Sequence, residues 1–118
     1  MKQYKIINAY KMLETLSDNE NLTEFDQWSI YKIRKILRPH IEFQEEREQS
    51  IRDKYIPYAD KDGIISGEHY VSFMQEMQKL AQMDVEIEPY IKPRIKLTKG
   101  ITYKTIEPLE EFIEFVEP

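Results

Sequence analysis

The sequence predicts a mostly helical α+β protein, in which a hairpin or bundle of three to four helices carries a C-terminal antiparallel β-hairpin packed on it. Apolar residues recur every three to four positions over most of residues 4–83, which is typical of amphipathic helices. Between residues 85 and 97 the period changes to two, which is typical of strands. The length of 118 residues suits one hydrophobic core, so we expect a single domain over residues 1–118.

The first predicted helix spans Tyr4 to Leu16. Its apolar positions lie three to four residues apart and share one face: Ile6, Ala9, Leu13 and Leu16. The polar, turn-forming stretch 17–21 ends it.

The second predicted helix is long, from Glu24 to about Tyr55, with Thr23 as its N-cap. Pro39 lies inside the pattern and predicts a kink or break near Leu37, because proline lacks a backbone donor and crowds the preceding turn. Two helices that meet at Pro39 are the alternative. The inner seam is apolar at first and polar in the middle; it consists of Ile30, Ile33, Leu37, Ile41, Gln44, Glu48, Ile51 and Tyr55.

A third amphipathic helix is expected from Glu68 to Met83, with Ser66 as its cap. The alternating stretch that follows can fold back about Ile91. This places apolar residues opposite one another on one face and opposite charges on the other, and it predicts the antiparallel hairpin. The facing pairs are Val85 with Leu97, Ile87 with Ile95, Glu88 with Arg94 and Glu86 with Lys96. A last short helix is expected from Pro108.

No motif predicts a catalytic residue, a metal site or a cofactor. The chain has no cysteine, and its two histidines, His40 and His69, form no recognisable metal signature. The stretch Asp60–Gly63 resembles the middle of a calcium loop, but Tyr58 and His69 occupy the positions of its first and twelfth ligands. We therefore expect a polar turn with a left-handed glycine and no enzymatic activity.

Charge and hydropathy narrow the classes of partner. The net charge of −5 argues against nucleic acid, because binding to phosphates usually needs a basic face. The basic run between Lys92 and Lys104, interleaved with Tyr90 and Tyr103, is partly neutralised by Glu86 and Glu88 across the predicted hairpin. No apolar run is long enough for a bilayer and no signal-peptide pattern is present, so we expect a cytoplasmic protein without a membrane partner.

The order of these features resembles a family of small proteins of unknown function from tailed bacteriophages and prophages. The resemblance lies in the stretch Ile33–Arg47 with its end at Ile51–Tyr55, in the turn Asp60–Gly63, in Phe73–Ile87 and in Ile106–Ile113. It covers most of the chain in order. The resemblance implies a phage or prophage origin, hence a location in the host cytoplasm or on the virion, and it carries over no catalytic residue.

The sequence favours a non-enzymatic protein that binds or assembles with protein partners, including a second copy of itself, through a helical surface. Trp28 and Phe43 mark this surface if they point away from the seam, while the polar seam positions predict a stretch that meets solvent or a partner. The expected interaction residues are Trp28, Phe43, Gln44, Glu48 and Tyr55. The alternative is an inhibitor of a host enzyme or defence system that acts through an acidic surface.

Overall fold

The computed structural model describes all residues, 1–118, and is mostly helical, with 61% of residues in helices. This confirms the predicted helical class. The elements in chain order are α1 Gln3–Ser17, α2 Glu24–Tyr55, the 3₁₀ turn η1 Ile56–Tyr58, α3 Gly67–Ala81, β1 Arg94–Lys96, α4 Tyr103–Ile106, the 3₁₀ turn η2 Glu107–Leu109, and β2 Glu114–Val116.

The helix α1 packs against the first half of α2 and forms the larger of two apolar clusters. Its predicted inner face is confirmed, because the four apolar residues assigned to it are buried. The C-terminal segment completes this cluster, which we call the body core. Its residues are Ile6, Ala9, Leu13, Leu16, Ile30, Ile33, Leu37, Ile95, Leu109, Phe112 and Ile113.

The long helix α2 is continuous from Glu24 to Tyr55, so the alternative of two helices meeting at Pro39 is wrong. Thr23 caps it as predicted: its Oγ1 accepts a hydrogen bond from the amide of Asp26 at 3.1 Å. Pro39 is exposed, and its ring faces solvent on the outside of the helix. The helix can therefore keep the proline, although the carbonyl four residues earlier loses its usual donor.

The second half of α2 pairs with α3 to form a two-helix projection, which we call the arm (residues 44–81). Its core is small: Ile51, Tyr55 and Leu80 are buried, and Ile65, Phe73 and Met77 are partly buried around them. Ser66 occupies the N-cap position of α3 as predicted, although its side chain makes no capping hydrogen bond.

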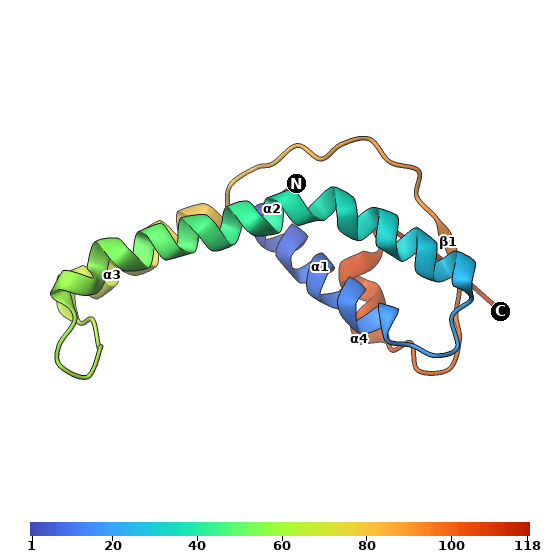
Figure 1. The fold of residues 1–118 in the computed structure, drawn as a ribbon, viewed down its shortest axis with the longest axis horizontal. Helices are drawn as coiled ribbons and strands as arrows, with labels where there is room; N and C mark the ends of the chain where they lie inside the picture. Colours follow the sequence, from blue (N-terminus) through green and yellow to red (C-terminus); the bar gives the residue numbers. More distant parts are fainter.

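The arm makes the molecule elongated (Figure 1). The principal extents are 54 × 29 × 19 Å and the radius of gyration is 17.8 Å. A compact chain of this length is expected to have a radius of gyration of about 13.5 Å. Only the body is therefore a conventional globular unit, and the arm extends into solvent with little of its own surface covered.

The predicted antiparallel hairpin is wrong. The strands β1 and β2 pair in parallel, with Ile95 opposite Phe115. Alternation in the sequence fixes which side chains share a face, but it does not fix which strand lies alongside. The buried position of Ile95 in the body core is satisfied by β2 rather than by residues 85–88. The predicted last helix from Pro108 is also wrong. The chain forms the short 3₁₀ turn η2 there, and the strand β2 follows after a turn.

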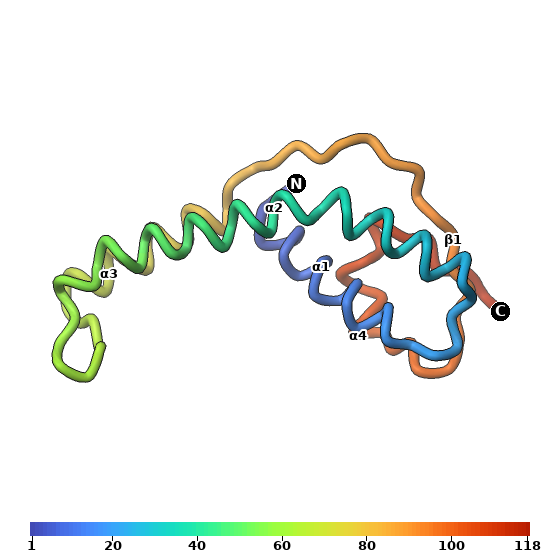
Figure 2. The backbone as a smooth tube through the Cα atoms, viewed as in Figure 1, coloured from blue at the N-terminus to red at the C-terminus, as the bar shows by residue number.

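Residues 82–93 form an extended strap that links the end of α3 to β1 and passes beside α2 (Figure 2). At its start the amide of Val85 donates to the carbonyl of Met1 at 2.8 Å. Near its end the hydroxyl of Tyr90 donates to the carbonyl of Glu111 at 2.8 Å, and its ring stacks on Phe112 with the centroids 5.7 Å apart. The strap thus binds Met1 and the C-terminal segment, and its Val85, Ile87 and Tyr90 pack against the body core.

Candidate protein-interaction surfaces

An aromatic patch lies on the outer side of α2, formed by Phe25, Trp28 and Tyr31. The rings of Trp28 and Tyr31 stack, with centroids 5.5 Å apart and an interplanar angle of 24°. They are 54% and 46% exposed, and Phe25 is 71% exposed. Stacking holds the two larger rings in place while leaving them open to solvent, so a partner would find them already ordered.

The helical period explains why this patch exists. Ile30 and Ile33 face the body core, and residues 28 and 31 fall on the opposite side of the helix. Lys32 lies beside the patch, with its Nζ 5.9 Å from the centroid of the Trp28 ring. Lys35, also exposed, follows on the same side of α2. The patch therefore has an apolar centre, with Lys32 and Lys35 on one side and the exposed Glu24 one turn before Trp28.

Arg38 continues this charged edge towards α1. The nearby hydroxyl of Tyr10 is the main cause that raises the pKa of Arg38 above its ordinary value. The ring of Tyr10 also lies 5.6 Å from the guanidinium of Arg34. These contacts link Arg34 and Arg38 of α2 to α1. The aromatic patch therefore lies on a part of α2 that is packed against α1.

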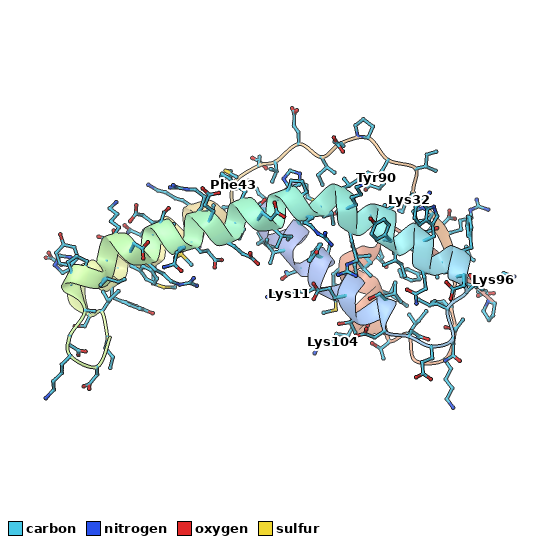
Figure 3. The ribbon with its side chains drawn as sticks, viewed as in Figure 1. Lys11, Lys32, Phe43, Tyr90, Lys96 and Lys104 are labelled. Carbon is cyan, nitrogen blue, oxygen red and sulfur yellow. The ribbon has the colours of Figure 1, made fainter.

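Phe43 also points away from the seam and is 42% exposed. Figure 3 shows Phe43 and Lys32 on the same upper side of α2 but well separated along it. The structure therefore bears out the outward orientation of Trp28 and Phe43, yet it does not bring them into one patch.

The other three predicted interaction residues lie inside or along the arm. Gln44 is only 8% exposed, and its Nε2 donates to Oε1 of Glu48 at 2.8 Å. Glu48 is half-buried and also accepts from Arg52 at 3.2 Å. Tyr55 is 6% exposed and packs edge-on against Phe73 at 5.6 Å. Gln44 and Tyr55, which were expected in the interaction surface, are therefore buried within this chain, and Tyr55 is covered by α3.

A charged pair joins the two helices of the arm on one side. The ammonium of Lys54 donates to Oε1 of Glu76 at 2.8 Å. Lys54, and after it the Tyr55 hydroxyl, lowers the pKa of Glu76 below its ordinary value. In return, Glu76 raises the pKa of Lys54 and is the main cause of a raised pKa for Tyr55. This cluster stabilises the packing of α2 on α3 while the carboxylate is ionised.

The tip of the arm holds a hollow of about 750 Å³ between the end of α2, the 59–66 loop and the start of α3. Its apolar lining comes from Ile56, Ala59, Ile64, Ile65, Tyr70 and Phe73. The loop is closed by Asp60, whose Oδ1 accepts hydrogen bonds from the amides of Asp62 and Ile64, both at 2.9 Å. Gly63 has φ +79°, so the predicted turn with a left-handed glycine is confirmed.

Sequence reasoning missed two exposed apolar groups. Phe25 and Tyr31 could have been found from their spacing around Trp28, opposite the seam. The outer side of α3 leaves Tyr70, Val71 and Met74 about half exposed. The sequence indicates this second group through the width of the apolar stripe on α3, which is broader than contact with one neighbouring helix requires.

The two histidines lie apart. His40 is in the middle of α2, where its carbonyl accepts from Gln3, whereas the ring of His69 stacks on Tyr58 at the arm tip with centroids 3.8 Å apart. No three His, Asp or Glu side chains converge in an arrangement that could hold a metal ion.

None of the helices of this chain has both the length and the apolar composition needed to cross a bilayer.

Comparison with protein-family models, with curated proteins and with solved structures gives no match to this chain. The resemblance to small phage proteins therefore stays a prediction from the sequence.

Proposed function

We propose that this chain is a non-enzymatic interaction or assembly protein that binds a protein partner through the aromatic patch of α2. The observation that carries the proposal is the stacked pair Trp28 and Tyr31, which is ordered by its own contact and about half exposed. Tryptophan and tyrosine dominate the energetics of protein interfaces, because each buries a large area at a small cost in side-chain entropy.

The surroundings of the patch favour a protein partner. Lys32 and Lys35 place positive charge at the edge of the rings, where carboxylates of a partner would meet them. Such an arrangement of an apolar centre with a charged rim is that of a protein interface. On the resemblance to small phage proteins, we further propose that the partner belongs to a phage particle or to the infected host cell.

A second function, inhibition of a host enzyme or defence protein, has its own observation. Glu42, Glu45 and Glu46 are all exposed along the middle of α2, and none of them takes part in an ion pair. An acidic surface of this kind would suit a partner with a basic active-site groove. The identity of the captured protein separates the two functions.

The test is a pull-down of the tagged full chain from cells that produce it in its native genetic setting, read by mass spectrometry. Wild-type protein is compared with the double variant Trp28→Ala/Tyr31→Ala and with Tyr103→Ala. Tyr103 is a matched control, because it is an aromatic residue that is 75% exposed on α4, away from the outer side of α2.

The patch predicts that the double variant loses its partner while Tyr103→Ala retains it. Removal of two central aromatic residues usually costs several kcal/mol of binding, about 4 kcal/mol or roughly a thousandfold in Kd. Capsid or tail proteins among the lost partners support assembly, and a single host enzyme supports inhibition. Equal capture by all three proteins overturns the assignment of the patch.

A further inference from the structure

We propose that the arm is completed by a second copy of this chain, which packs its α3 antiparallel against α3 through a stripe formed by Tyr70, Met74, Met77 and Ala81. The inference goes beyond the proposed function, because it concerns the other lobe of the molecule and a different partner. It rests on the symmetry of the stripe, on the absence of charge along it, and on the surface that the arm leaves exposed.

The stripe reads the same in both directions. Its four residues are separated by four, three and four positions, which is the spacing of one continuous helix face. In an antiparallel pair related by a two-fold axis, Tyr70 meets Ala81 of the other copy and Met74 meets Met77. The largest side chain then faces the smallest, and the two flexible thioethers face each other, so the surface complements itself.

The stripe is open to a partner. Tyr70 is 48% exposed and Met74 is 45% exposed, while Met77 and Ala81 are partly buried at its inner margin. Val71, beside the stripe, is 53% exposed. Tyr70, Val71 and Met74 thus leave three large apolar side chains about half exposed on one short helix.

None of the charged side chains of α3 lies on the stripe. The charged residues of α3 are Glu68, Glu76 and Lys79, and the helical period places all three on the side away from the stripe. Glu76 is held there by Lys54 of α2. The side chains that flank the stripe on its solvent side include Gln78, which is polar and uncharged. The helix α3 therefore brings no charge of its own onto the stripe, while Arg52, Asp60 and Lys61 line the hollow beside Tyr70.

The exposed area is of the size that a stable dimer buries. The chain exposes 8380 Å², whereas a compact monomer of 14.3 kDa is expected to expose about 6,800 Å². The difference is about 1,600 Å², within the roughly 1,000–2,500 Å² that each partner buries in an obligate homodimer. The arm projects from the body and contributes to this surplus.

Pairing would also enlarge the small hydrophobic core of the arm. Only three residues are buried between α2 and α3, which is a small core for two helices. Two arms laid together through their α3 helices give four helices around a shared interior, as in a four-helix bundle.

The experiment is sedimentation equilibrium on the full chain across the micromolar range, with three proteins compared: wild type, Met74→Lys and Gln75→Lys. The two variants add the same charge to neighbouring exposed positions of α3, one on the stripe and one on the far side. We expect wild type and Gln75→Lys to have twice the 14.3 kDa mass of the chain, and Met74→Lys to have that mass once.

Circular dichroism establishes that Met74→Lys keeps its helices, and crosslinking tests the register. Because the chain has no cysteine, a mixture of Met74→Cys and Met77→Cys chains should give a disulfide-linked dimer on oxidation, and Gln75→Cys should not. A wild-type chain that remains monomeric throughout, or a dimer that survives Met74→Lys, overturns the proposal. Capture of a partner by the monomeric Met74→Lys variant would leave the function of the aromatic patch standing.

Discussion

Gln3 donates a hydrogen bond from its Nε2 to the carbonyl of His40 at 2.9 Å. Gln3 is fully buried at the start of α1, and His40 follows Pro39 in the middle of α2. The side chain of α1 thus binds the backbone of α2 beside the proline. It fixes the start of α1 at the point where the body ends and the arm begins.

Gln3→Ala should lower the free energy of unfolding by about 1–3 kcal/mol, because it removes this donor from a buried site. Chemical denaturation monitored by circular dichroism measures the change. Gln49→Ala is the control, since Gln49 bonds to Asp53 at 2.8 Å on an exposed side of α2. That variant should stay within about 0.5 kcal/mol of wild type. Equal effects of the two substitutions would contradict the anchoring role of Gln3.

Pro39→Ala should raise the free energy of unfolding by up to about 3 kcal/mol, because an amide donor returns to a helix that is already continuous. Pro57→Ala is the comparison, because it should change the free energy of unfolding in the opposite direction. Pro57 lies at the start of η1, where its fixed backbone angle suits the turn. Its removal should destabilise the chain by about 0.5–1 kcal/mol through the unfolded state. A destabilised Pro39→Ala variant would mean that the proline positions the arm.

Leu80→Ala should loosen the arm and leave the body intact, because Leu80 is one of only three buried residues of the arm core. The expected local cost is about 2–3 kcal/mol. Hydrogen exchange should quicken across the amides of α3 while those of α1 keep their protection. Uniform loss of protection in both helices would show instead that body and arm unfold as one unit.

The pair of Lys54 and Glu76 predicts a dependence of arm stability on acid. Because the pKa of Glu76 in the folded chain is lowered from its ordinary value of 4.5, the contribution is present above that pH. It is lost as the pH falls below 4.5 towards the lowered value. Thermal unfolding measured from neutral pH to pH 3 should show this loss for wild type. Glu76→Gln should flatten that part of the curve, whereas Glu46→Gln on the outside of α2 should not.

The helices were predictable because their signals are local. The apolar spacing of α1, the capping residue Thr23 and the seam of α2 depend only on neighbours within one or two turns. The strands depend on distant partners. The alternation around Ile95 is equally compatible with parallel and antiparallel neighbours, and the partner strand at Phe115 is too short to distinguish from a helix by its period.

The candidate surfaces were predictable only in part, for a related reason. Trp28 and Phe43 could be placed outside because they lie off the seam of α2. The burial of Tyr55 requires knowledge of which helix covers the end of the seam, and that helix is the chain's own α3, whereas Gln44 lies beside α1. The sequence of a helix therefore shows which positions lie on its seam, but it does not identify the segment that packs against them.

The most direct test of the central claim, that the chain binds a protein partner through the aromatic patch, uses Trp28 as a reporter. It is the only tryptophan, so labelling with fluorotryptophan gives one fluorine NMR signal from the patch. Titration with the protein recovered in the pull-down should shift this signal and protect it from a soluble paramagnetic quencher. Binding that leaves the signal of Trp28 unshifted and fully accessible would contradict the claim.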